Sequence, residues 1–141
     1  AIGTDAHVEM ADVGDKAAVD RMAANALATF GRIDVVINAA AIRPATPFLD
    51  MTDDDLAHVM NVNCNAAVWL SRACLPGMID GGYGRIINFS GMNAQQGTAD
   101  RPSVTMSKHA VWGLTKALSR EFGTKGITAN IISPGTFTRA T

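Results

Sequence analysis

The sequence predicts an α/β fold in which a doubly wound parallel sheet of about four strands has helices on both faces. Three short runs rich in Ile and Val, at residues 33–38, 85–90 and 128–132, lack strict polar–apolar alternation. Such runs are typical of strands that are buried on both faces. A weaker run at residues 7–11 is the candidate for a fourth strand. Long segments of helical period separate the runs, and connections of that length join parallel strands.

Three segments repeat apolar residues at the helical period. The first spans residues 15–30 and precedes Gly31, and the second follows a capping Thr52 and covers residues 53–78. The third, residues 103–122, is apolar on two sides. A helix that is apolar on two sides needs two covers, here the sheet and a partner subunit. We therefore expect a homodimer or homotetramer that assembles through helices 53–78 and 103–122.

The composition predicts one globular domain over residues 1–141. Of the 141 residues, 48% are hydrophobic and 18% are charged, so the chain can bury a core. The formal net charge of -1 provides no field for binding nucleic acid or an anionic membrane surface. No apolar run approaches the ~20 residues of a membrane-spanning helix. We expect neither a nucleic-acid partner nor a membrane partner.

The cysteines and histidines indicate no disulfide and no metal site. Cys64 and Cys74 lie ten residues apart within one predicted helix, where they cannot reach each other. We therefore expect free thiols and a reducing, cytoplasmic location. The three histidines, His7, His58 and His109, show no metal-ligand spacing.

The carboxyl ends of the predicted strands define the place where a ligand would bind, because ligands of open parallel sheets bind beyond that edge. Small or polar residues follow the strands at 38–41, 90–93 and 133–136. Small residues let a flat ligand approach the backbone closely. The last predicted helix runs antiparallel to the strands, so Lys108 in its first turns returns to the same edge.

Several short motifs, in their order and spacing, resemble the short-chain dehydrogenase/reductase family from end to end of the chain. The motifs are Asp12-Val13, Asn38-Ala39-Ala40-Ala41, Val62-Asn63, the stretches 84–90 and 113–118, and Pro134-Gly135. This resemblance implies a Rossmann-like fold. It also implies hydride transfer between the nicotinamide of NAD or NADP and a small-molecule carbonyl or alcohol substrate.

The same resemblance implies roles for individual residues. The residues implied to bind the cofactor are Asp12, Val13, Asn38, Ala39, Ala40, Lys108, Pro134 and Gly135. Lys108 would also lower the pKa of a catalytic tyrosine, and Asn63 would hold a proton-relay water. Ser90 is adjacent to the position of the family's serine, which hydrogen-bonds the substrate oxygen. The implied catalytic residues are therefore Asn63, Lys108 and Ser90.

Two positions of the family's catalytic set are changed in this chain. The family's proton donor is a tyrosine four residues before the lysine, where this chain has Val104. The family's serine position, thirteen residues earlier, is Gly91. Valine cannot give or take a proton, and the single tyrosine, Tyr83, precedes a strand and so lies at the opposite edge of the sheet. We expect an altered proton route or a loss of catalysis.

The family's glycine-rich pyrophosphate turn and its C-terminal substrate region have no counterpart in these residues, so we expect a piece of a longer protein. In the family's strand order, 3-2-1-4-5-6-7, two further strands would separate the run at 7–11 from the strand at 33–38. Three interpretations stay open: an NAD(P)-dependent oxidoreductase with an altered proton-donor site, a catalytically inactive nucleotide-binding relative, and a subunit-assembly module. Arg43 and Arg101 lie in loops near the ligand edge, where they could meet an anionic substrate, but the sequence alone does not support that role.

Overall fold

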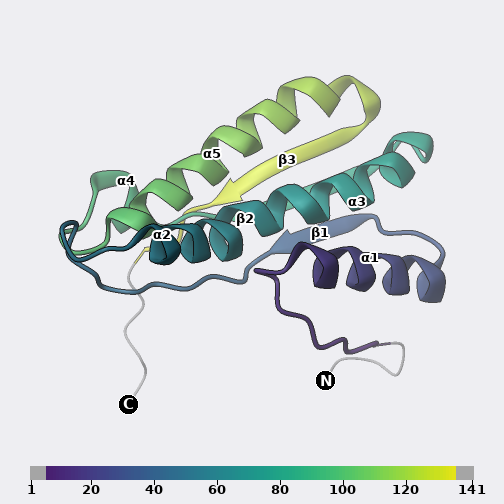
Figure 1. Ribbon diagram of the computed structural model, residues 1–141. Coiled ribbons are helices and arrows are strands. Elements are labelled where there is room, and N and C mark those ends of the chain that lie inside the picture. Colours follow the sequence, from purple (N-terminus) through teal and green to yellow (C-terminus); the bar gives the residue numbers. More distant parts are fainter. Residues whose placement is uncertain (1–5, 136–141) are drawn as a thin grey trace, which may run out of the picture.

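The computed structural model describes residues 6–135, apart from the side chains of residues 93 and 94, so the predicted contribution of Thr136 lies outside the described residues. Helices and strands follow one another along the chain (Figure 1), and their bounds are α1 Lys16–Phe30, β1 Val35–Asn38, α2 Asp53–Met60, η1 Asn61–Asn65, α3 Ala66–Asp80, β2 Gly84–Phe89, α4 Met92–Gln96, α5 Pro102–Phe122, η2 Gly123–Lys125 and β3 Ile127–Ile132. The predicted helices at 15–30 and 103–122 are confirmed as α1 and α5, with bounds shifted by one residue at one end.

The sheet is parallel, as predicted. Its strands lie in the order β1-β2-β3, and both pairs run in the same direction. The register aligns Val36 with Ile86 and Ile86 with Ala129, so the inward-facing residues of the three strands form one row. All three strands therefore end at a common carboxyl edge, which is the edge where the sequence predicts a ligand.

The predicted fourth strand at residues 7–11 is not present, because that segment forms no strand in the described structure. An extended segment becomes a strand only where a neighbour satisfies its backbone hydrogen bonds. Within the described residues, the sheet pairs only β1, β2 and β3 with one another, and none of them pairs with residues 7–11. The described sheet therefore has three strands and not four.

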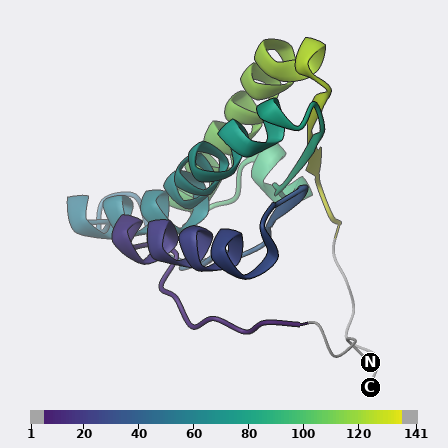
Figure 2. The same ribbon diagram turned by 90° about the vertical axis from the view of Figure 1, so that its right-hand side faces the viewer.

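The helices pack on one face of the sheet, whereas we expected helices on both. Figure 2 shows the long helices gathered on one side of the strands. On the other face Val35 and Ile37 are 47% and 58% exposed. The reason is that each crossover moves one step in the same direction along the sheet. Right-handed crossovers that keep one direction place their helices on one side, and only a reversal of direction places helices on the other side.

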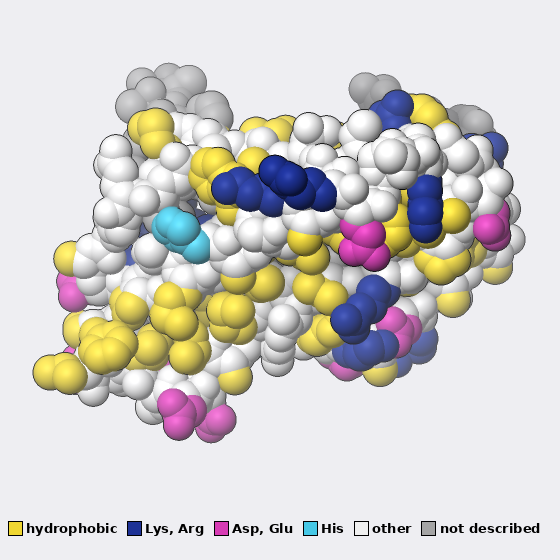
Figure 3. Space-filling model, turned by 90° about the horizontal axis from the view of Figure 1, so that it is seen from above, with side chains coloured by type: hydrophobic (Ala, Val, Ile, Leu, Met, Phe, Trp, Pro, Cys, Tyr) yellow, Lys and Arg dark blue, Asp and Glu magenta, His cyan; other side chains and the backbone are white. Residues whose placement is uncertain are grey.

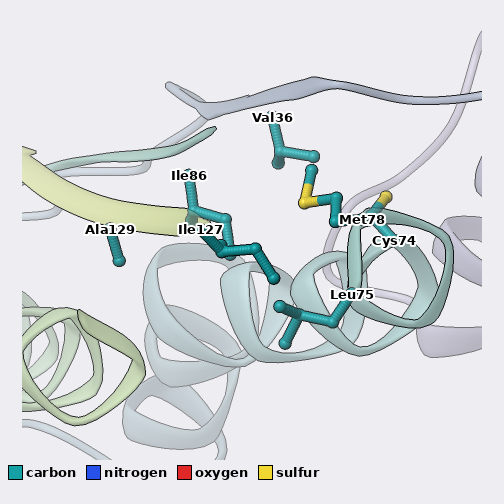
Figure 4. Packing of buried hydrophobic residues seen from close by; sticks show 7 residues of the cluster. All are labelled: Val36, Cys74, Leu75, Met78, Ile86, Ile127 and Ala129. Carbon is teal, nitrogen blue, oxygen red and sulfur yellow. The ribbon is translucent and has the colours of Figure 1, made fainter. Parts of the chain in front are cut away.

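The hydrophobic core lies between the sheet and α3 (Figure 4). The buried residues that form it are Val36, Ile86, Ile127 and Ala129 of the strands and Cys74, Leu75 and Met78 of α3. Both cysteines are free and buried, which confirms the expectation from the sequence. This core fixes the strands against the helix and so determines where each strand ends.

The predicted helix 53–78 is continuous but not regular. Thr52 begins it with a capping box, in which its hydroxyl accepts from the Asp55 amide and the Asp55 carboxylate accepts from the Thr52 amide. The five residues of η1 then form a π-helical turn before α3 continues to Asp80. Among the helices of residues 6–135, none has the length and apolar character needed to span a bilayer.

Candidate functional site

Two neighbouring cavities lie at the carboxyl edge of the sheet. The larger cavity has a volume of about 490 Å³ and is lined by residues that follow the three strands and by the first two turns of α5. The smaller cavity, of about 220 Å³, is lined by residues of α1, β1, η1 and α3. Ala39 and Phe89 line both cavities, so the two share a wall.

Lys108 is a buried cation in the wall of the larger cavity. It lies in the second turn of α5 and is only 7% exposed. Its Nζ donates a hydrogen bond of 2.9 Å to the carbonyl oxygen of Phe89 at the end of β2. An ammonium has three donors, so two remain for a molecule in the cavity. Burial lowers the pKa of Lys108, and the positive charge of Arg43 lowers that pKa further.

The positions where the family has tyrosine and serine both line the larger cavity. Val104 lies one turn before Lys108 on the same face of α5 and is buried. Gly91 follows β2 in an extended conformation, and a Cβ built there would meet no atom within 4 Å. Within the described residues, the cavity wall thus contains the lysine but neither the phenol nor the serine hydroxyl at those positions.

Asn63 ties together three segments that surround the site. It lies in η1 and is only 4% exposed. Its Oδ1 accepts from the Ile42 amide at 2.8 Å, and its Nδ2 donates to the Ile42 carbonyl at 3.0 Å and to Ser107 Oγ at 3.1 Å. Ser107 Oγ in turn donates to the Val104 carbonyl at 2.9 Å. The amide side chain therefore fixes the loop after β1 and the first turns of α5 relative to η1.

A second series of hydrogen-bonded polar side chains joins two strands of the sheet to α5. Asn38 Nδ2 donates to Asn88 Oδ1 at 2.7 Å, and Asn88 Nδ2 donates to Thr115 Oγ1 at 2.9 Å. Thr115 Oγ1 then donates to the Val111 carbonyl at 2.7 Å. These bonds link the ends of β1 and β2 to the middle of α5, so the relative positions of the two strand ends are fixed by polar contacts as well as by packing.

The structure brings most of the predicted site residues to the two cavities. Those that line the larger cavity are Ala39, Ser90, Lys108, Pro134 and Gly135. Those that line the smaller cavity are Val13, Asn38, Ala39, Ala40 and Asn63. The strand ends are also joined directly, because the Ser90 amide donates to the Ile132 carbonyl and the Met92 amide donates to the Pro134 carbonyl. Asp12 lines neither cavity, and its Oδ1 accepts from the Gly14 amide at 2.8 Å.

Four residues at the site were not assigned from the sequence. Arg43 and Arg101 line the larger cavity, whereas the sequence placed them only in loops near the ligand edge and did not support a role in binding an anionic substrate. Asn88 and Ser107 are fully buried in the hydrogen-bond chains described above. The signal for Asn88 was available, since an amide within an otherwise apolar strand needs a buried partner. Ser107 carried no comparable signal, because serine occurs commonly on exposed helix faces.

The fold agrees with the comparisons to known proteins. A family model described as "Enoyl-(Acyl carrier protein) reductase" matches residues 1–140. The chain belongs to the short-chain dehydrogenase/reductase family of oxidoreductases. A short-chain dehydrogenase structure from Streptomyces avermitilis superimposes with a TM-score of 0.87 at 30% identity, over 93% of this chain and 48% of that one.

Relatives of several activities are similar to this chain in sequence. One is a 2-dehydro-3-deoxy-L-rhamnonate dehydrogenase (NAD(+)) from Sphingomonas sp. (strain SKA58), 36% identical over 93% of this chain and 53% of the relative. Another is an acetoacetyl-CoA reductase from Allochromatium vinosum, also 36% identical, over 94% of this chain and 54% of the relative. A metagenomic short-chain oxidoreductase solved in complex with NADP has a TM-score of 0.87 at 28% identity, over 92% and 59% of the two chains. The chain spans about half the length of the curated relatives it matches.

Proposed function

We propose that the protein is an NAD(P)(H)-dependent oxidoreductase that moves hydride between a nicotinamide and a carbonyl or alcohol substrate, with an altered proton-donor site. The observation that carries this proposal is the buried ammonium of Lys108 in the wall of a cavity at the carboxyl edge of a parallel sheet. The family includes an NAD(+) dehydrogenase and a structure in complex with NADP, which supports NAD or NADP as the cofactor.

The residues at this edge fit the nicotinamide and ribose part of such a cofactor. Gly91 and Gly135 leave the wall of the larger cavity open, since a Cβ at Gly91 meets nothing within 4 Å and one at Gly135 meets only Met92 Cε at 3.8 Å. Of the two donors that Lys108 has available, one would bind a ribose hydroxyl and one is left for the substrate oxygen. The smaller cavity, next to Asn38, would hold a further part of the cofactor. When bound, the nicotinamide supplies the hydride chemistry.

The chain's own contribution would be binding, orientation and a proton. Val104 provides no proton, so the altered route must use another group in the cavity wall. Lys108 lines the larger cavity as a buried titratable group, and its pKa is lowered by burial and by the neighbouring charge of Arg43. A lowered pKa makes the ammonium a better acid, and we infer that Lys108 both binds the cofactor and is the proton source. Asn63 would act as a positioning residue, because its side chain holds the Ile42 backbone.

The alternative is a catalytically inactive relative that binds the nucleotide or serves in subunit assembly. Val104 and Gly91 favour it, because both family positions for the proton donor and the substrate hydrogen bond are empty of polar side chains. The two candidate functions share the cofactor site and differ in turnover. An experiment that measures binding and turnover separately therefore distinguishes them.

The test uses the protein in its natural full length and compares Lys108→Ala with Lys116→Ala, an exposed lysine on the same helix. We expect Lys108→Ala to weaken NADH or NADPH binding at least about tenfold and to abolish carbonyl reduction, while Lys116→Ala changes neither. Equal binding by both variants would refute the cofactor role of Lys108. Binding without any turnover in the unmodified protein would establish the inactive alternative.

A gain-of-function variant separates the two candidates further. Gly91 has an extended backbone and open space at its Cβ, so Gly91→Ser needs no rearrangement. Val104→Tyr would extend a phenol along the face shared with Lys108 into the 490 Å³ cavity. Because a positioned general acid contributes about 10²–10⁴-fold, we expect the double variant to raise the reduction rate by at least about 10²-fold. No increase, with cofactor binding intact, would show that the missing groups do not limit the reaction.

We also propose a homodimer or homotetramer that assembles through helices 53–78 and 103–122. The exposed face in Figure 3 has hydrophobic side chains gathered into a patch toward one end of the view. Met106 on α5 is 49% exposed, and Trp69 and Trp112 are half-buried on the two helices. Sedimentation of Trp112→Glu tests the assembly, because an unchanged oligomer would remove this interface. The two free thiols support a reducing, cytoplasmic location.

A further inference from the structure

We propose that the larger cavity binds a substrate that carries a carboxylate, and that Arg43 and Arg101 hold this group. The proposal rests on the proposed function, since it names the class of substrate for that same site. It follows from the charges that line the cavity and from the way in which the two arginine loops are joined.

The wall that the described residues form around the larger cavity is cationic and contains no acidic side chain. Three of its lining residues, Arg43, Arg101 and Lys108, are basic, and none is an aspartate or a glutamate. Lys108 is buried, Arg101 is half-buried and Arg43 is exposed, so the charges extend from the interior to the mouth. Within residues 6–135, the ion pairs lie elsewhere and involve neither of the two arginines.

The two arginines come from loops that are fixed to each other by their backbones. The Thr46 amide, in the loop after β1, donates to the Asp100 carbonyl at 2.6 Å. The Arg101 amide donates to the Thr98 carbonyl at 3.2 Å, and its own carbonyl accepts from the Thr105 amide at 3.0 Å in the first turn of α5. These bonds place Arg101 at the start of α5 and keep the loop that carries Arg43 beside it.

Like charges in one cavity repel, and a bound anion removes that repulsion. The charges interact in the described structure, because Arg43 lowers the pKa of Lys108. A guanidinium presents paired N–H donors that match the two oxygens of a carboxylate, and such charge-assisted hydrogen bonds are stronger than neutral ones. Val104 and Ala41 supply apolar wall for the carbon part of the molecule. A small keto acid or hydroxy acid fits this combination of charge, size and apolar surface.

The probes for the test are acetoacetate and its neutral methyl ester, which share the same ketone and differ in charge. Their affinities are measured by calorimetry on the natural full-length protein, with and without saturating NAD⁺ or NADP⁺, neither of which allows reduction. We expect acetoacetate to bind at least about tenfold more tightly than the ester. Arg43→Ala with Arg101→Ala should remove that preference without weakening NADP⁺ binding. The control is Arg120→Ala, which replaces an exposed arginine in the last turn of the same helix and should change nothing.

Four results would overturn the proposal. Equal affinities for acid and ester would remove the preference that the arginines are inferred to create. Equal weakening of both probes by the double variant would indicate a structural role for the arginines. Weaker NADP⁺ binding with unchanged acetoacetate binding would assign them to a cofactor phosphate. If inorganic phosphate displaced bound acetoacetate at a lower concentration than acetate does, the site would be assigned to a phosphate-bearing molecule. Failure of both NAD⁺ and NADP⁺ to bind refutes the proposed function instead, and arginine-dependent acetoacetate binding without a cofactor would still support this inference.

Discussion

Asn63 should stabilise the site far more than its neighbours on the same turn, and replacing it by alanine tests this. Asn63→Ala removes three hydrogen bonds, two to the Ile42 backbone and one to Ser107. At about 1 kcal/mol for each bond, the loss is about 3 kcal/mol. Alanine returns about 0.5 kcal/mol because it is a better helix former than asparagine. We therefore expect the free energy of unfolding to fall by about 2–3 kcal/mol.

The matched control is Asn65→Ala in the same π-helical turn. Asn65 makes one side-chain hydrogen bond, to Asn61 at 2.8 Å, and it is only half-buried. The same arithmetic predicts a change of less than about 1 kcal/mol for this variant. Urea denaturation of the natural full-length protein measures both values.

A local measurement keeps this prediction independent of global unfolding. The Ile42 amide is the donor to Asn63 Oδ1, so its hydrogen exchange reports directly on that bond. A local loss of about 2 kcal/mol corresponds to exchange about 30-fold faster. If Asn63→Ala costs no more than Asn65→Ala, or if Ile42 exchanges at an unchanged rate, Asn63 does not hold the loop and its positioning role is refuted.

Three further predictions concern packing and burial elsewhere in the fold. Gly126→Ala should lower the free energy of unfolding by more than Gly31→Ala does. For Gly31→Ala we expect a loss of about 1–2 kcal/mol, because its backbone has a positive φ. Gly126 also has a positive φ, and a Cβ there would in addition collide with the Gly82 carbonyl. Equal thermal shifts for the two variants would contradict this. Ser71→Ala should raise the free energy of unfolding, measured in urea, by about 1 kcal/mol, because Ser71 Oγ is buried without a hydrogen-bond partner in the described structure. A loss of stability would mean that this hydroxyl does make a hydrogen bond. Burial raises the pKa of Cys74 from 9.0 to about 11. The thiol therefore ionises at lower pH in the unfolded state than in the folded state, and the free energy of unfolding should fall between about pH 9 and pH 11. Denaturation curves over this pH range should show a smaller fall for Cys74→Ala, and an identical fall would exclude this thiol as its cause.

The sequence was sufficient to predict the direction of the strands, since long helical segments between buried runs are typical of parallel strands. It also located Lys108, because the antiparallel direction of α5 places its first turns at the carboxyl edge of the sheet. The prediction of a strand at residues 7–11 was wrong. Its pattern is that of a strand, but a strand also needs a neighbouring backbone, and local pattern contains no information about neighbours.

The charge of the cavity and its hydrogen-bond chains could not be derived in the same way. Arg43 and Arg101 are 58 residues apart in sequence, and the contact that joins their loops is a backbone bond with no side-chain signature. The spacing of apolar residues over 53–78 likewise does not predict the π-helical turn that carries Asn63. Sequence reasoning identified Asn63 as buried and polar, whereas its partners, Ile42 and Ser107, required coordinates.

The helices cover only one face of the sheet, so the other face is exposed to solvent although its side chains are apolar. Val35 and Ile37 of β1 and Ile132 of β3 are among the exposed large hydrophobic residues on the strands. A polypeptide limited to residues 6–135 would expose this surface together with open strand edges, a combination that favours self-association and precipitation. For this reason the binding and stability measurements require the protein in its natural full length, and solubility of the shorter polypeptide would itself report how well that surface is tolerated.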